Sequence, residues 1–241
     1  EAGQNKVVTA NIDIYERYVQ IQTKSSIDAK TVKVLNPKEV VFEGGRELEL
    51  DAVSEVPRYY VCNAYGVCGI YSAPGTAVKE AYDTSGIVTN DRGVTVWLKG
   101  NRVSRNQIMA IKEESVTEQK NSLAVCLDNI LRHAGITRNT EYDLAQGKTA
   151  TTILSENMTG VQVLDLSGCT LDAVLYYVNQ DIPVLAILED GEAVLVTGFN
   201  EFNVVIMEPA TGKLYKKGMN DATAWFAENG NHFITYMRTE N

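Results

Sequence analysis

The chain has 241 residues, 44% of them hydrophobic, which is enough apolar material to fill the core of one large domain or two small ones. Its 31 acidic and 22 basic side chains give a formal charge of -9, which opposes the electrostatic attraction behind nucleic-acid and anionic-membrane binding. No run approaches the ~20 apolar residues that a membrane span needs. We therefore expect neither a nucleic-acid partner nor a membrane span.

The first residues show no basic segment followed by an apolar one, which is the pattern of a signal peptide. We expect either a cytosolic protein or a trimmed piece of a secreted one.

Residues 1–112 predict a small α+β accessory region. Residues 7–50 predict strands and turns: 7–21 is rich in Val, Ile and Tyr, and 31–35 and 39–42 are short strand candidates. From residue 58 the pattern predicts a hairpin over 58–71, a helix after Pro74, and a strand pair that turns at 90–93.

Two groups of side chains in this region could face a partner. One is aromatic, but aromatic residues on short strands belong more often to a core: Tyr59, Tyr60, Tyr65, Tyr71 and Trp97. The other is basic and in so acidic a protein is most simply a solvated face: Lys99, Arg102 and Arg105. Neither group has the pattern of a catalytic site.

The four cysteines bear on the compartment. Cys62 and Cys68 flank a hairpin tip, and their separation can place them opposite one another, within reach of a disulfide. Two small buried thiols are the alternative, and Cys126 and Cys169 form a weaker second pair. The cysteine spacing is not that of a metal site, and the two histidines have no cysteine at ligand distance in the sequence. No metal and no other cofactor is expected.

Residues 116–241 predict a central helix packed on an antiparallel sheet, which is an α+β arrangement. Apolar residues recur at helical spacing after Ser122, with Asn121 to cap the first turn and Gly135 to end the last. A second helix is predicted over 170–179. Three strands follow as an antiparallel meander, then a short helix capped by Asn220 or Asp221, then a last strand; these elements cover 183–188, 193–199, 203–207, 220–227 and 232–237.

Three motifs in this half occur in an order that is typical of one family. Residues 121–135 read NSLAVCLDNILRHAG, residues 192–199 read EAVLVTGF, and residues 204–212 read VVIMEPATG. They resemble the D-C-G-x-A-C-L-x-x-I-L-x-x-x-G helix, the H-A-V-V-V-T-G-Y strand and the V-x-V-x-D-P-x-x-G segment of the bacteriocin-processing, double-glycine cysteine peptidases, a bacterial branch of the papain-like fold. The resemblance covers about half of the chain and implies a papain-like domain over residues 116–241.

The same resemblance implies that the catalytic site is degenerate. It places Ser122 at the nucleophilic cysteine, Glu192 at the histidine and Glu208 at the orienting aspartate, with Cys126 at a second, structural cysteine. Gln119 is the nearest match to the oxyanion glutamine, which stands further upstream in the family. A papain-type enzyme needs a thiolate activated by an imidazole, and a glutamate that titrates near pH ~4.3 is a poor base for a hydroxyl.

Other residues offer two ways to rescue the chemistry. Cys126 lies one turn inside the helix, where its thiol would face the core, and His133 lies seven residues further on, about 10.5 Å along the axis and beyond hydrogen-bond reach. Ser122 with Glu192 and Glu208 could form a serine-carboxyl arrangement at acidic pH. The simpler interpretation is that Glu192 is a solvated turn residue and Glu208 caps a strand.

We therefore expect a non-catalytic papain-like domain that recognises a peptide or a cell-wall component, or acts as a scaffold, in a bacterial surface or secreted protein. The alternatives are an active cysteine peptidase or amidase with an unrecognised nucleophile and base, and a structural spacer. A cytoplasmic location is the alternative to an extracellular one.

Overall fold

The computed structural model divides into two compact units, residues 1–56 and residues 57–241. In the first unit the structure describes three strands, and in the second it describes residues 57–63, 66, 68–100, 105, 107–113 and 121–239. The predictions for residues 7–21, Tyr65, Arg102 and Gln119 lie outside these residues. The described part combines helices with antiparallel sheets, which confirms the α+β class.

The first unit contains an antiparallel sheet of three strands in chain order. They are β1 (Val32–Asn36), β2 (Glu39–Phe42) and β3 (Arg46–Glu49). The first two match the predicted strands. The third was not predicted, because its sequence RELE carries a single apolar residue and gives no strand pattern.

The second unit begins with a four-stranded sheet and one helix, where the sequence predicted a hairpin, a helix and a strand pair. The elements are β4 (Tyr59–Cys62), β5 (Cys68–Tyr71), α1 (Pro74–Thr84), β6 (Ile87–Asn90) and β7 (Thr95–Leu98). Cys62 and Cys68 are paired residues of β4 and β5, and they form the predicted disulfide. Tyr59 and Trp97 are buried, so these two aromatic side chains belong to the core.

A six-stranded antiparallel sheet organises the rest of this unit, in the order β12-β11-β10-β9-β13-β8. Its strands are β8 (Val161–Asp165), β9 (Val184–Ile187), β10 (Ala193–Phe199), β11 (Asn203–Glu208), β12 (Lys213–Gly218) and β13 (His232–Arg238). Strands β9 to β11 form the predicted meander, and the predicted last strand, β13, inserts between β9 and β8. The sheet therefore places the start of β10 near its middle and leaves β12 at one edge.

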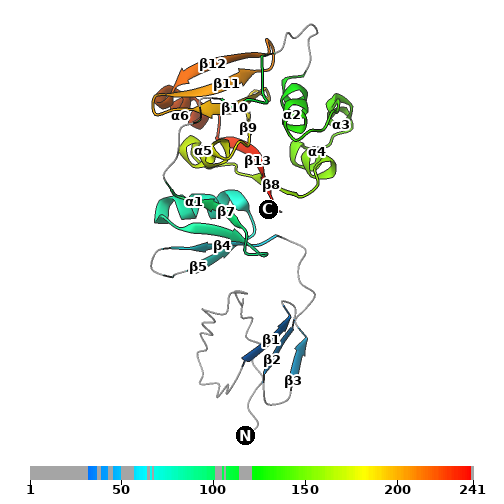
Figure 1. The fold of residues 1–241 in the computed structure, drawn as a ribbon, viewed down its shortest axis with the longest axis vertical. Coiled ribbons are helices and arrows are strands. Elements are labelled where there is room, and N and C mark those ends of the chain that lie inside the picture. Colours follow the sequence, from blue (N-terminus) through cyan, green and yellow to red (C-terminus); the bar gives the residue numbers. More distant parts are fainter. Residues whose placement is uncertain are drawn as a thin grey trace. The chain divides into compact units, whose positions relative to one another are not determined.

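Five helices accompany this sheet. They are α2 (Ser122–His133), α3 (Glu141–Ala145), α4 (Ala150–Asn157), α5 (Leu171–Asn179) and α6 (Met219–Glu228). Figure 1 shows α2, α3 and α4 grouped on one side of the sheet and α5 and α6 on the other. Helix α2 packs on β10 and β9, and its apolar face is buried through Leu127, Ile130 and Leu131.

The caps of two helices test the sequence predictions directly. The Asn121 side chain accepts the N–H groups of Leu123 and Ala124 at 2.9 and 3.2 Å, which confirms the predicted cap of α2. The predicted cap of α6 was wrong. Gly218 is its N-cap residue, and Asn220 and Asp221 already lie in the first helical turn.

Residues 57–113 share one hydrophobic core with residues 121–239. The Trp97 indole N–H donates to the Ala173 carbonyl at 2.9 Å, and the Tyr177 hydroxyl donates to the Val96 carbonyl at 3.0 Å. These buried bonds tie β7 to α5 within the compact unit that begins at residue 57. The division into an accessory region, residues 1–112, and a papain-like domain, residues 116–241, stays a prediction.

Over the described ranges, no helix combines the length and the apolar character that a membrane crossing requires.

Candidate functional site

The N-terminus of α2 meets the first residue of β10. The Ala193 N–H donates to the Ser122 hydroxyl oxygen at 3.0 Å, although the two residues are 71 positions apart. Strand β10 pairs with β11 only from Leu195 onward, so Ala193 lies before that ladder, and the serine oxygen supplies its acceptor. Ser122 is buried, with 9% of its surface exposed. Its oxygen thus has a structural role at the end of the sheet.

Glu192 lies next to this contact in a tight turn. Its N–H donates to the Asp190 side chain at 3.0 Å, and its carbonyl accepts the Leu188 N–H at 2.7 Å. Its side chain is exposed, as predicted for a solvated turn residue. Burial raises the pKa of Cys126 well above the usual thiol range, and the negative charge of Glu192 raises that pKa further. The structure therefore brings Ser122, Cys126 and Glu192 into one neighbourhood.

Glu208 is the last residue of β11 and closes a hairpin. It is paired with Lys213 of β12, and its carboxylate accepts the Thr211 hydroxyl at 2.7 Å. In the part of the chain that the structure describes, no hydrogen bond joins Glu208 to Ser122 or Glu192. The Glu208 side chain is hydrogen-bonded within the turn between β11 and β12.

The two remaining cysteines are free thiols, so the weaker predicted pair between Cys126 and Cys169 was wrong. Both are fully buried. Burial raises the pKa of Cys169 to about 12, and this thiol donates to the Gly75 carbonyl at 3.3 Å. A thiol in either place stays protonated at neutral pH and lacks the reactivity of a thiolate.

The chain has two histidines, and the buried one lies at the far end of α2. His133 is eleven residues beyond Ser122, which is about 16 Å along the helix axis at ~1.5 Å per residue. Its Nδ1 lies 3.0 Å from the Tyr236 hydroxyl and its Nε2 lies 3.6 Å from the Asp181 carboxylate, with 3% of the side chain exposed. His232 is an exposed residue at the start of β13. Neither imidazole bonds a cysteine.

The contacts around His133 also correct the prediction that Arg105 lies on a solvated face. The Arg105 guanidinium pairs with the Asp181 carboxylate at 2.8 Å, and the Arg105 side chain is 34% exposed. Burial lowers the pKa of His133, while the carboxylate of Asp181 acts in the opposite direction. Burial also raises the pKa of Tyr236 to about 12. This group of residues holds α2, β13 and the end of α5 together.

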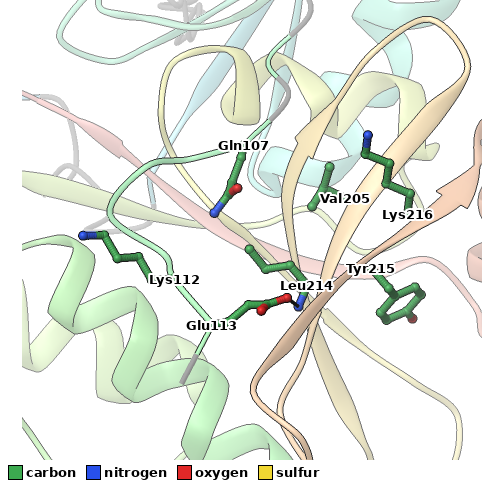
Figure 2. Close-up of a pocket in the computed structure, with 7 residues that line it drawn as sticks. All are labelled: Gln107, Lys112, Glu113, Val205, Leu214, Tyr215 and Lys216. Carbon is green, nitrogen blue, oxygen red and sulfur yellow. Dashed lines mark hydrogen bonds between the residues drawn. The ribbon is translucent and has the colours of Figure 1, made fainter. Parts of the chain in front are cut away.

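A second feature, which the sequence did not reveal, is an open pocket of about 510 Å³ beside β12. Figure 2 shows the segment 107–113 running past β11 and β12, with the Glu113 carboxylate directed at the backbone of Leu214. That carboxylate accepts the Leu214 N–H at 3.0 Å. The pocket is lined by Gln107, Lys112, Glu113, Val205, Leu214, Tyr215 and Lys216. The lysine-rich run 213–217 is a sequence signal that could have drawn attention to it.

In the described ranges, no three His, Cys, Asp or Glu side chains lie close enough together to hold a metal ion.

No family model matches the sequence, and no curated protein matches it. Among solved structures, the chain is similar to a protein from Bacillus anthracis that is described as a candidate C39-like peptidase. The two share 12% sequence identity, with a TM-score of 0.49 over 58% of this chain and 100% of the other.

Proposed function

We propose that residues 116–241 form a papain-like domain without peptidase chemistry, which serves recognition or scaffolding in a bacterial surface or secreted protein. One observation carries the proposal. The hydrogen bond from Ala193 to Ser122 supports it, because this bond sets the start of α2 beside the residue that follows Glu192. With Ser122 at the nucleophile and Glu192 at the histidine, as the resemblance implies, the site carries a hydroxyl and a carboxylate in place of a thiol and an imidazole.

The chemistry of these substitutes supports a non-catalytic role. A serine hydroxyl becomes a useful nucleophile only when a base removes its proton, and glutamate is ordinarily ionised at pH values where it is too weak a base for that task. The serine oxygen also accepts the Ala193 N–H, so its position is fixed by the sheet. Of the two imidazoles, His133 is about 16 Å from Ser122 along α2, by the ~1.5 Å rise of a helical residue. His232 is an exposed residue of β13, two strands away from Ala193 across β9.

The disulfide supports an extracellular location. Disulfides persist in oxidising compartments and are rare in the bacterial cytoplasm. Cys62 and Cys68 form one at the tip of the β4–β5 hairpin. A cytoplasmic location would require that these cysteines be reduced in the native protein, which the mass of the purified protein under non-reducing conditions would reveal.

A ligand screen tests recognition and catalysis together. The folded protein would be incubated with extended peptides and with cell-wall fragments, and its melting temperature would be recorded, because a ligand that binds only the folded state raises it. Each ligand would then be weighed by mass spectrometry. We expect a stabilising ligand that is recovered intact. A ligand that is recovered cleaved would identify an active peptidase or amidase and overturn the proposal.

A further inference from the structure

Strand β12 forms one edge of the six-stranded sheet and carries hydrogen-bonding groups that face outward. Its neighbour on one side is β11. The Leu214 N–H bonds to the Glu113 carboxylate and not to β11, so it points away from the sheet. Outward and inward groups alternate along a strand of an antiparallel pair, and the N–H of Lys216 therefore points outward as well.

The charge of this edge is opposite to that of the protein. Strand β12 reads KLYKKG, with three lysines and no acidic residue, in a chain of formal charge -9. Its side chains alternate between the two faces of the sheet. The Lys217 ammonium lies 5.0 Å from the centre of the Trp225 ring of α6, so Lys217 and Lys213 lie on the α6 side. Lys216 lies on the opposite side, so each face of β12 carries at least one lysine.

The pocket lies on the side of Lys216. It brings Lys216 of the strand and Lys112 of the 107–113 segment to one open space of about 510 Å³ (Figure 2). Both lysines are exposed. The Glu113 carboxylate accepts a hydrogen bond from one outward N–H group of β12, so the edge already donates to an acidic side chain of the same chain. The next outward donor, at Lys216, lies two residues along the strand.

We propose that the outer edge of β12 binds an acidic peptide in an extended conformation, which adds to the sheet as a further strand. Backbone carbonyls of the peptide accept hydrogen bonds from the edge, and its alternating side chains contact the two faces. Acidic side chains on one face meet Lys216 and Lys112, and those on the other meet Lys213 and Lys217. This inference rests on the proposed recognition function and names its surface and its partner class.

Charge excludes a second copy of the chain as the occupant through β12 itself. Two copies of β12 paired edge to edge would set lysines opposite lysines, and like charges directly across a strand pair are destabilising. Exposed lysines also protect edge strands from aggregation, and a protective role alone would require no ligand. The test below separates these cases.

Binding would be measured by fluorescence anisotropy with labelled ten-residue peptides of repeating Glu-Glu-Thr-Thr (Glu–Thr peptides), which carry acidic side chains on both faces of an extended strand. Peptides of repeating Lys-Lys-Thr-Thr (Lys–Thr peptides) are the control. Lys216→Glu reverses one charge at the edge. Lys216→Pro removes the outward N–H but leaves the bonds to β11, since that N–H does not take part in them. Lys79→Glu, at an exposed position on α1, makes the same charge change away from the edge.

We expect the Glu–Thr peptide to bind and the Lys–Thr peptide not to bind, with weaker binding at higher salt. Both Lys216 variants should raise the Kd by at least about 10-fold, and Lys79→Glu should leave it unchanged. The Lys216 amide should also exchange more slowly with deuterium in the complex. If Lys216→Pro fails to fold, by circular dichroism, Lys216→Glu and the exchange measurement still decide the question.

Three results would overturn the inference. One is equal binding by the wild type and Lys216→Glu, which places the peptide elsewhere and leaves the recognition function intact. Another is no binding of the acidic peptide at all, in which case the lysines serve to protect the edge. The third is a dimer in sedimentation that Lys216→Pro abolishes. Cleavage of the peptide would instead overturn the non-catalytic function.

Discussion

The two ends of helix α2 contrast in what they hold and in what they do. At its N-terminus, Ser122 accepts the Ala193 N–H beside Glu192, at the positions that the sequence resemblance predicts for the reacting groups. At its C-terminus, His133 contacts Asp181 and Tyr236, an imidazole with a carboxylate and a hydroxyl, but with 3% of its side chain exposed. An imidazole, a carboxylate and a hydroxyl meet at the C-terminal end, but the imidazole there is buried. Suitable residue types make a catalytic site only when they lie together and a substrate can reach them.

The largest expected effect is slow alkylation of Cys126, the thiol nearest to the N-terminal end of α2. Cys126 and Cys169 are fully buried, and burial raises the pKa of both. An alkylating reagent should label them at least ~100-fold more slowly in the folded protein than in denaturant, because reaction then requires unfolding. Mass spectrometry after tryptic digestion measures each site. Fast labelling of Cys126 in the native protein would show a reactive thiol near the N-terminal end of α2 and would favour an enzyme.

The two histidines provide a matched pair for the C-terminal end. His133→Ala should destabilise the protein by about 3 kcal/mol, because it leaves a cavity and deprives the Tyr236 hydroxyl of a buried partner. His232→Ala, at an exposed position, should change stability by less than ~0.5 kcal/mol. Urea denaturation measures both. Equal effects of the two substitutions would contradict a structural role for His133.

A smaller effect is expected for the serine. Ser122→Ala removes the acceptor of the Ala193 N–H and should cost about 1 kcal/mol of stability. Ser155→Ala, at an exposed site on α4, is the control and should be close to neutral. If Ser122→Ala leaves the unfolding midpoint in urea unchanged, the serine oxygen has no structural role and its position needs another explanation.

The smallest effect concerns pH. Burial lowers the pKa of folded His133 below the unfolded value of 6.5. As the pH falls, His133 is therefore protonated in the unfolded state before it is protonated in the folded state. Its contribution to stability is full above pH 6.5 and declines as the pH falls from 6.5 toward the lower pKa of the folded state. Asp181 opposes this shift, while Arg238 adds to it. Wild type should lose more stability than His133→Gln between pH 7 and pH 5 in urea titrations, and a loss of the same size in both would contradict this assignment.

The elements that the sequence predicted are those with a local signal. Helix α2 has a capping residue and regular apolar spacing, and the β4–β5 hairpin has two cysteines around its turn. Strand β8 and helix α4 were missed. Strand β8 mixes Gln and Asp with Val and gains its place by pairing with β13, and α4 carries two threonines and an isoleucine that weaken a helical pattern.

For the candidate site, the sequence resemblance assigns Ser122 and Glu192 to one catalytic site, and this assignment stays a prediction. The bond from Ala193 to Ser122 shows that the start of α2 lies beside the start of β10. Contacts between distant residues gave no signal in the sequence. His133 and Tyr236 are 103 positions apart, so only the folded chain reveals the contacts of the buried imidazole. Glu113 and Leu214 are 101 positions apart, so the same holds for the hydrogen bond at the edge of β12.

The most direct test of the missing base is a cleavage assay with the wild type and Ser122→Ala. Both proteins would be incubated with a peptide library between pH 4 and pH 8, and the products would be identified by mass spectrometry. We expect no cleavage above background from either protein at any pH. Cleavage by the wild type that disappears in Ser122→Ala would show that a base reaches this hydroxyl after all, and would contradict the account.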